Sequence, residues 1–452
     1  MPIRLSLLGL LHILCLTSCL IAQQDTQPTS KREDLIPEPV SRLLTVAQKD
    51  GRTRPTFRLD LNSGHITVPV TIANQTFQAA FDTGSSISVV DRALQPLLGK
   101  KVADANLSSG ALKVRTEVFE CPDFRLESLK LPFVDPNRPA IVSVWDMKDA
   151  RDASRDNIDV IIGVAHFMKA RMQVNFDTKT LRFLYRDDDF IGESINVKFS
   201  ERGTPSIVGR IADSSKGKSN LDEPVMPNAG EEVHFLVDTG FSECLGLRSG
   251  LFDRLVKRGD IRLLGTLSAV SFRGHLQQTR LGRLRRLTIG DFTIDNLTVI
   301  DSRDAGLNVI GVSLLSRFLV TFVFPRSQMF LAPGTKFDQP DLTGIQGFGV
   351  FFQPKNSVET RRNHLTVVSI DPDGPAEKTG LKEKDVIERI DDHEFEGKSL
   401  FQIIRSFEKP GQDLKLRIRR GEETRDITIA IPKVPPGMFA LDGSAATHKT
   451  VK

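Results

Sequence analysis

The sequence predicts a mostly β chain made of two similar lobes and a smaller C-terminal α+β module. Three observations support this prediction. The tripeptide Asp-Thr-Gly occurs twice, at Asp82 and at Asp238, each time at the end of a short apolar strand. Each copy is followed by an apolar segment that ends in glycine, at Gly163 and at Gly311, so the features repeat in the same order. Toward the C-terminus the style changes, with denser charge and helix-like spacing of apolar residues.

The composition is that of an ordinary globular protein. The 452 residues provide room for two or three domains, and 61 basic residues nearly balance 57 acidic ones. The densest basic run, 280–286, is interpreted as a solvated strand edge, since one Trp and one Tyr offer no aromatic interleaving for nucleic acid. The four cysteines form no CxxC or Cys/His cluster. We therefore expect no nucleic-acid partner, no metal and no cofactor.

Residues 1–22 are predicted to be a signal peptide. Arg4 precedes the apolar run 5–16, which is too short to span a bilayer but fits the central region of an export signal. Two cleavage sites remain open. Leu16-Thr17-Ser18-Cys19 is similar to a bacterial lipobox, in which Cys19 would be lipidated, and Leu20-Ile21-Ala22 is a weaker ordinary site. We expect an exported protein of the periplasm, of the cell envelope with a lipid anchor, or secreted.

The remaining boundaries follow from composition and from the repeat. Residues 23–53 are polar and read as a flexible leader, and whether they are a pro-segment stays open. The further predicted units are a first lobe at 54–190, a second lobe at 191–337, the C-terminal module at 338–434 and a disordered tail at 435–452. The Asp-to-Gly spacings are 81 residues (82 to 163) and 73 residues (238 to 311). Such close values favour duplicated lobes that pair within one chain, and hence a monomer.

The paired Asp-Thr-Gly motifs suggest acid–base chemistry. Two carboxyl groups within hydrogen-bond distance cannot both ionise cheaply, so they share one proton and their pKa values separate. The ionised group can take a proton from water while the protonated group polarises a carbonyl. Glycine permits a close backbone approach, and a threonine hydroxyl can hold the opposite loop.

These residues resemble those of the aspartic protease clan, which includes pepsins and retropepsins, over about residues 57–333. The resemblance implies two retropepsin-like β-barrel lobes in a pseudo-twofold arrangement, with Asp82 and Asp238 as catalytic residues. The supporting active-site loop residues would be Thr83, Gly84, Ser85, Thr239 and Gly240. It implies an aspartic endopeptidase whose substrates are polypeptides.

One departure from the clan pattern leaves an alternative open. Ser85 can bind the outer oxygen of Asp82, as the family does, but Phe241 stands at the corresponding place of the second motif. The alternative is a catalytically silent, protease-like binding or adaptor protein. Two glycine-bearing turns, 108–110 and 272–275, are candidate flap tips.

The C-terminal module resembles a PDZ domain. The segments 374–381 and 385–390 carry the resemblance, although Lys384 stands where glycine is usual. Four further residues resemble the PDZ loop that binds a chain-terminal carboxylate: Gly347, Phe348, Gly349 and Val350. The resemblance implies that the next strand, near 350–352, pairs with a C-terminal peptide ligand as an added strand.

Overall fold

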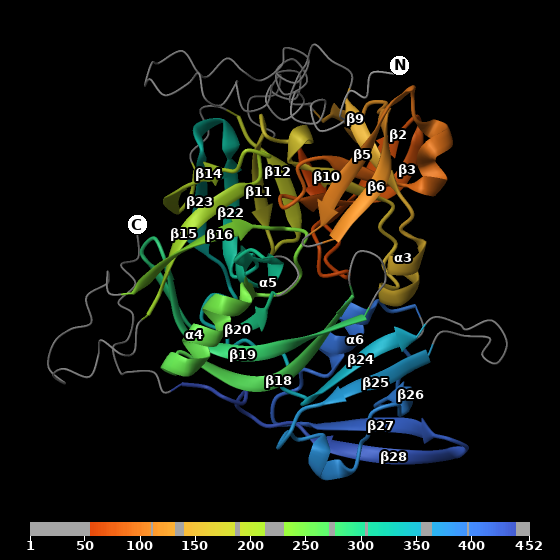
Figure 1. The fold of residues 1–452 in the computed structure, drawn as a ribbon, viewed down its shortest axis with the longest axis vertical. Helices are drawn as coiled ribbons and strands as arrows, with labels where there is room; N and C mark the ends of the chain where they lie inside the picture. Colours follow the sequence, from red (N-terminus) through yellow and green to blue (C-terminus); the bar gives the residue numbers. More distant parts are fainter. Residues whose placement is uncertain are drawn as a thin grey trace, which may run out of the picture.

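The computed structural model describes residues 55–109, 112–131, 140–185, 190–212, 230–270, 276–302, 306–353, 364–395 and 397–439. The predicted signal peptide, the lipobox with Cys19 and the leader lie outside this part, as do Gly110 and 271–275 at the predicted flap tips. Strands dominate the described residues, which confirms the predicted mostly β class (Figure 1). In the same part of the chain, no helix is long and apolar enough to cross a membrane.

The first lobe is formed by a nine-stranded sheet that contains the strand carrying Asp82. In spatial order its strands are β5 (Lys101–Ser109), β6 (Leu112–Glu120), β9 (Ile141–Trp145), β4 (Ser88–Asp91), β10 (Val160–Gly163), β3 (Gln75–Asp82), β2 (Thr67–Ile72), β7 (Arg125–Leu126) and β8 (Leu129–Lys130). Val68, Val70 and Ile72 alternate along β2 and are fully buried, as a strand with one inward face requires. The described helical segments of this lobe are η2 (Arg92–Leu97), α3 (Lys148–Ser154) and η3 (Val164–His166).

The second lobe is formed by an eight-stranded sheet. Its order is β14 (Lys198–Phe199), β15 (Pro205–Ile211), β16 (Glu231–Val237), β21 (Val309–Ile310), β17 (Leu245–Leu247), β20 (Phe292–Asp301), β19 (Leu276–Ile289) and β18 (Ile261–Val270). Helices α4 (Ser249–Arg258) and α5 (Val312–Leu315) and the segment η5 (Phe324–Arg326) accompany it. Helix α4 ends at Gly259, whose φ of 85° is the left-handed conformation that glycine adopts at a helix end.

The two lobes repeat one strand arrangement. In the first, β3 runs parallel to β10 while β4 lies antiparallel to β10 and parallel to β9. In the second, β16 runs parallel to β21 while β17 lies antiparallel to β21 and parallel to β20. The internal repeat predicted from the sequence is therefore present in the strand order.

A shared six-stranded sheet joins the lobes. Its order is β1 (Thr56–Arg58), β12 (Thr180–Phe183), β11 (Arg171–Asn175), β22 (Phe318–Val323), β23 (Gln328–Pro333) and β13 (Glu193–Asn196). The central pair, β11 and β22, comes from different halves of the chain, and Gln173 Nε2 donates to Thr321 Oγ1 across it at 3.1 Å. One continuous apolar core runs through both lobes.

The C-terminal module is a separate five-stranded sheet. Its order is β24 (Phe348–Gln353), β25 (His364–Ile370), β26 (Val386–Ile390), β27 (Asp413–Arg420) and β28 (Glu423–Ala430), accompanied by η6 (Glu377–Thr379) and α6 (Leu400–Ser406). A capping box of Ser399 and Gln402 begins α6. Lys384 has a φ of 72°, which explains physically why glycine is usual there. Strand β24 lies at the edge of the sheet, below the first lobe in Figure 1.

Two sequence interpretations need correction. The run 280–286 lies in β19, which has strands on both sides and is not an edge; Arg283 is fully buried and donates to the carbonyls of Asn296, Asp341 and Pro436. The prediction of a disordered tail from 435 is wrong for 435–439, because Phe439 is buried and exchanges hydrogen bonds with Asn296. Both errors have the same cause. The buried Arg283 is hydrogen-bonded to Pro436 of the tail and to Asp341 of the segment before the C-terminal module, so the basic run and the tail lie against each other.

Candidate active site

The two Asp-Thr-Gly loops meet at the junction of the lobes. Asp82 ends β3 and Asp238 follows β16, and their carboxyl groups are hydrogen-bonded to each other. The structure therefore brings together the two carboxyl groups that the sequence singles out, from positions 156 residues apart.

The threonines of the two motifs hold the loops by reciprocal hydrogen bonds. The backbone N–H of Thr83 donates to Oγ1 of Thr239, and the N–H of Thr239 donates to Oγ1 of Thr83, both at 3.0 Å. Each hydroxyl then donates to a carbonyl of the opposite strand, Thr83 to Val237 at 2.5 Å and Thr239 to Phe81 at 2.6 Å. Since both threonines are buried, these four bonds fix one loop against the other.

The motif glycines are required because each lies against the opposite carboxyl group. A Cβ atom added to Gly84 would lie 2.4 Å from Cγ of Asp238, and one added to Gly240 would lie 2.5 Å from Cγ of Asp82. Any side chain at either position would push the carboxyl groups apart. The backbone N–H groups of Gly84 and Ser85 donate to Oδ1 of Asp82, at 2.8 and 3.1 Å.

The electrostatics of the pair are unequal. Burial raises the pKa of Asp82, and the hydrogen bonds from Asp238, Gly84 and Ser85 oppose that rise. Burial together with the charge of Asp82 raises the pKa of Asp238 well above its usual range. The backbone N–H of Gly240 donates to Oδ1 of Asp238 at 2.8 Å, and the backbone N–H of Gly84 also bonds to this carboxyl group. One proton shared by the two carboxyl groups therefore relieves the cost of burying both charges together.

A glycine-ended strand packs behind each loop. Gly163 lies opposite Asp82, and a Cβ there would meet the carbonyl oxygen of Ile87 at 2.6 Å. Gly311 takes the same place in the second lobe, where a Cβ would lie 2.1 Å from the carbonyl oxygen of Glu243. The closeness of these backbones explains why both apolar segments end in glycine.

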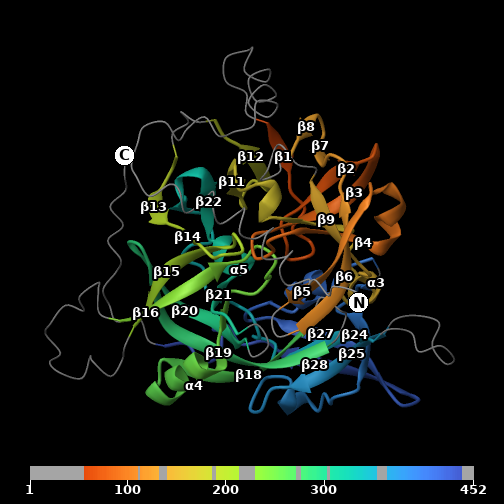
Figure 2. The ribbon, with the colours of Figure 1, turned by 45° about the horizontal axis from the view of Figure 1, so that its top comes forward.

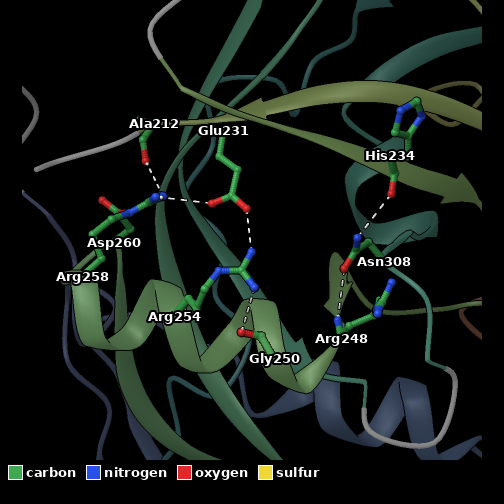
Figure 3. Close-up of polar contacts among 9 residues, drawn as sticks. All are labelled: Ala212, Glu231, His234, Arg248, Gly250, Arg254, Arg258, Asp260 and Asn308. Carbon is green, nitrogen blue, oxygen red and sulfur yellow. Dashed lines mark hydrogen bonds and ion pairs between the residues drawn. The ribbon is translucent and has the colours of Figure 1, made fainter. Parts of the chain in front are cut away.

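A set of polar contacts holds the second of these strands in place (Figure 3). Asn308, directly before β21, donates to the carbonyl of His234 on β16 and accepts from the backbone N–H of Arg248 at the start of α4. Arg254 and Arg258 on α4 pair with Glu231 at the other end of β16. Helix α4 is thereby fixed to the strand that carries Asp238.

The residues that follow the two motifs behave differently from the sequence expectation. The hydroxyl of Ser85 donates to the carbonyl of Ile87 at 2.7 Å, so the backbone of Ser85 and not its hydroxyl contacts Asp82. The ring of Phe241 packs against an apolar cluster of Leu267, Leu281 and Ile300 below the β18–β19 hairpin. Both side chains therefore support their loops, one by a hydrogen bond and the other by packing.

Sequence reasoning missed His65. Its ring donates a hydrogen bond to the backbone carbonyl of Thr239, so a residue of the first lobe supports the second motif. Burial lowers the pKa of His65 to about 4, and Nδ1 has no hydrogen-bond partner among the described residues. Neither spacing nor motif could reveal this contact, because His65 lies in a turn far in sequence from Thr239.

A second histidine is buried behind the first loop. Nδ1 of His166 lies 2.7 Å from Oγ of Ser88, which also accepts the backbone N–H of Gly163 at 3.0 Å. Both residues are almost fully buried, and burial lowers the pKa of His166 to about 3. In the described part of the chain, no group of three or more His, Cys, Asp or Glu side chains could hold a metal ion.

The four residues of the predicted carboxylate-binding loop lie at the start of β24. Gly347 has a φ of 73° and its N–H donates to the carbonyl of Gly344, while Phe348 and Val350 point into the core of the module. Gly349 pairs with Ser369 of β25. The loop therefore leads directly into the edge strand β24, which lies next to α6.

Comparison with known proteins identifies the C-terminal module. The family profile of the PDZ domain matches residues 348–431, so the chain contains a PDZ domain. A probable CtpA-like serine protease of Staphylococcus epidermidis is 33% identical over 107 residues, which cover 23% of this chain and 21% of that protein. A probable periplasmic serine endoprotease DegP-like protein of Halomonas elongata is 32% identical over 79 residues, or 18% of this chain and 17% of that protein.

These relatives are matched only in part, since the chain spans about a fifth of their length. Among solved structures, an aspartic proteinase from Irpex lacteus matches 64% of this chain and 99% of its own, with 14% identity and a TM-score of 0.42. At that level the likeness carries no argument. The names of the relatives are those of proteases with serine chemistry, and they do not support the aspartic type expected from the sequence.

Proposed function

We propose that the chain is an exported aspartic endopeptidase in which Asp82 and Asp238 form the catalytic pair. One observation carries the proposal: two carboxyl groups from two lobes share a hydrogen bond, within loops locked by four reciprocal threonine bonds. A structural role does not explain this arrangement, because burying two like charges together costs stability unless one of them is protonated.

In the proposed mechanism the two aspartates take different roles. Asp82, which accepts two N–H groups of its own loop, is the ionised partner and takes a proton from the attacking water. Asp238 holds the shared proton and donates a hydrogen bond to the carbonyl oxygen of the scissile peptide bond. The water oxygen adds to the carbonyl carbon, and the proton on Asp82 is then passed to the leaving amine as the C–N bond breaks.

The names of the relatives suggest a serine-type function. Among the described residues, the side chains of Ser88 and His166 are in hydrogen-bond contact, as such a function would require. The geometry of this contact disfavours that function. Ser88 is fully buried and its oxygen already accepts the N–H of Gly163, so a substrate carbonyl has no approach to it. The serine-protease names belong to matches that cover less than a third of this chain.

The second candidate is a catalytically silent binding protein, which Phe241 favoured from the sequence. The structure makes Phe241 a weaker argument for this candidate. The hydroxyl of Ser85 bonds to Ile87, so neither lobe uses a hydroxyl directly after its Asp-Thr-Gly motif to contact the aspartate. The carboxyl groups also lie within reach of one shared proton, as an active pair requires.

The PDZ domain and the N-terminal signal set the proposed context. We propose that the PDZ domain binds polypeptide partners through their C-terminal carboxylates at the loop formed by Gly347, Phe348, Gly349 and Val350. The protein would act outside the cytoplasm, in the periplasm or envelope, as the name of the Halomonas relative says of that protein. Lipidation of Cys19 would anchor it to the membrane.

The test is cleavage of a mixed peptide library by purified chain between pH 4 and 7. We expect Asp82→Asn and Asp238→Asn each to lower kcat by at least about a thousandfold while thermal unfolding still shows a folded protein. A peptide with a secondary hydroxyl in place of the scissile carbonyl should inhibit, since it imitates the hydrated intermediate.

The control is a serine-reactive phosphonate, which should leave cleavage unchanged. Inhibition by that reagent, together with full activity of Asp82→Asn, would show serine chemistry and end the aspartic proposal. Folded wild type that cleaves nothing in the library would instead favour the silent binding protein.

A further inference from the structure

The PDZ domain does not stand apart from the lobes. In the first lobe, α3 contacts both β24 and α6, the strand and helix that border a PDZ peptide groove. Figure 1 shows α3 directly above these two elements. Ala153 of α3 is 1% exposed and belongs to the apolar core of the PDZ domain, and the guanidinium of Arg155 lies 3.9 Å from the ring centre of Phe352. The space beside the edge strand is therefore filled by the chain itself.

Helix α3 is firmly attached to its own lobe. Arg151 donates to Oδ2 of Asp91 at 2.8 Å, and the backbone N–H of Met147 donates to the same oxygen at 2.9 Å. Asp91 ends β4, a neighbour of the strand that packs behind the first catalytic loop. A ligand that enters the groove must consequently move the PDZ domain away from α3, since α3 cannot easily leave the lobe.

The same PDZ helix contacts the turn at 62–65, which supports the second Asp-Thr-Gly loop. Oγ of Ser399, which caps α6, donates to the carbonyl of Asn62 at 2.5 Å. The ring of Phe401 covers Gly64, where a Cβ would come within 2.8 Å of it, and the next residue is His65, which holds Thr239. On the second loop, Glu243 lies in the field of Arg405 and Glu408 near the end of α6.

The second lobe is attached to the PDZ domain as well. The backbone N–H of Thr266 on β18 donates to Asp371 at 3.0 Å, and Gln278 on β19 donates to the carbonyl of Val368 at 2.7 Å. Figure 2 shows the β18–β19 hairpin lying along β24 and β25. The domain therefore bridges both lobes close to the proposed active site.

We propose that α3 is an internal occupant of the PDZ groove and that a peptide with a free C-terminal carboxylate binds by displacing the domain from α3. Release of the PDZ domain from α3 withdraws α6 from Asn62 and Gly64. The contact between His65 and Thr239 is then less well supported, and turnover decreases. The coupling to turnover rests on the proposed peptidase function, whereas the competition for the groove does not.

The binding experiment uses the full-length chain with Asp82→Asn, so that peptides are bound without turnover. Ala153→Arg places a long charged side chain where α3 is buried against the domain. Asp149→Arg, at the exposed start of the same helix, is the matched control. The probe is a library of random peptides with free C-termini, followed by amidated copies of the selected sequences.

We expect Ala153→Arg to bind the selected peptides at least tenfold more tightly than the parent or the control, and amidation to abolish the gain. Equal affinity for all three chains overturns the proposal. Selection of no peptide by any of them also overturns it, because the freed groove would then have no ligand for α3 to exclude. Should Ala153→Arg fail to fold, Arg155→Ala removes the contact with the ring of Phe352 and should give a gain of about threefold.

The activity experiment uses the chain with both aspartates intact. Ala153→Arg should lower kcat at least fivefold with KM unchanged, while Asp149→Arg should leave both constants unchanged. A higher kcat in Ala153→Arg would overturn the supporting role of the docked domain. If the parent chain is inactive, the peptidase proposal fails, and the binding experiment alone decides the competition.

Discussion

The two Asp-Thr-Gly loops share the reciprocal threonine hydrogen bonds and differ in what lies behind them. In register, Val89 pairs with Ile161 in the first lobe, and Gly246 pairs with Val309 in the second. The first loop therefore reaches this point in seven residues after Asp82, and the second in eight after Asp238. The additional residue lies in the segment that contains Phe241, whose ring packs into the second lobe.

The same register shows a contrast in the buried layer. Ser88 and His166 form a polar contact behind the first loop, and the equivalent positions of the second lobe hold Leu245 and Leu314. The two Asp-Thr-Gly loops are thus supported from behind by a polar contact in the first lobe and by apolar packing in the second. The Asp-Thr-Gly residues are the same in both lobes. The buried residues behind the loops can differ, as long as they fill the space and their polar atoms have hydrogen-bond partners.

The strongest way to break the comparison is at the two strand-end glycines. Gly311→Ala should prevent folding or cost more than about 3 kcal/mol, because its Cβ would meet two carbonyl oxygens at 2.1 and 2.4 Å. Gly163→Ala should cost about 1–3 kcal/mol, since its nearest carbonyl oxygens lie at 2.6 and 2.8 Å. Urea unfolding measures both. Gly250→Ala on α4, where a Cβ meets nothing within 4 Å, is the control and should be neutral or slightly stabilising. Equal costs at the two glycines would contradict the difference between these two sets of distances.

Acid should reveal the polar layer of the first lobe. Because the pKa of His166 is about 3 when folded and near 6.5 when unfolded, the unfolded chain binds the proton first. Stability is therefore complete above about pH 6.5 and falls as the pH drops toward 3, by about 2–3 kcal/mol at pH 4.5. His166→Leu, which imitates Leu314, should flatten the fall in melting temperature between pH 6.5 and 4.5. His234→Leu, at an exposed ring of the second lobe, should not.

Exchange of the residues after the motifs should sharpen the contrast between packing and hydrogen bonding. Phe241→Ser leaves a cavity beside Leu267, Leu281 and Ile300 and should cost about 2 kcal/mol. Ser85→Ala removes the hydroxyl bond to Ile87 and should cost about 1 kcal/mol, with kcat changed less than threefold. Thermal unfolding and peptide cleavage check both variants. A hundredfold loss of kcat in Ser85→Ala would show that its hydroxyl serves Asp82 during turnover.

A moderate effect on the rate is expected at His65, which supports the second motif. His65→Leu removes the bond to the Thr239 carbonyl and should lower kcat about tenfold, about 1.4 kcal/mol, with KM unchanged. His65→Gln keeps a donor and should recover most of the rate. Equal rates for the two variants would mean that the ring acts by packing and not by its hydrogen bond.

The sequence predicted the parts of the site whose physical requirements are local. Glycine beside a carboxyl group and glycine at a strand end are recognisable because only that residue fits, so Gly84, Gly163, Gly240 and Gly311 stood out. His65 and Ser88 could not be recognised in this way. Their partners lie in other elements, and a histidine in a turn or a serine in a strand is compatible with many environments. The ordered tail to Phe439 was missed for the same reason, since Arg262, Arg283 and Asn296 bind it from another part of the chain.

By itself the sequence determined a duplicated β chain, a pair of Asp-Thr-Gly loops and a C-terminal PDZ module. Short stretches of sequence specify these features, because strand alternation and the conformational freedom of glycine allow few other local structures there. Only the tertiary structure decided that the two aspartates meet at a hydrogen bond and where the PDZ domain lies. Burial, charge and edge-strand contacts arise between segments far apart in sequence, so their energies depend on the folded arrangement and not on any local pattern.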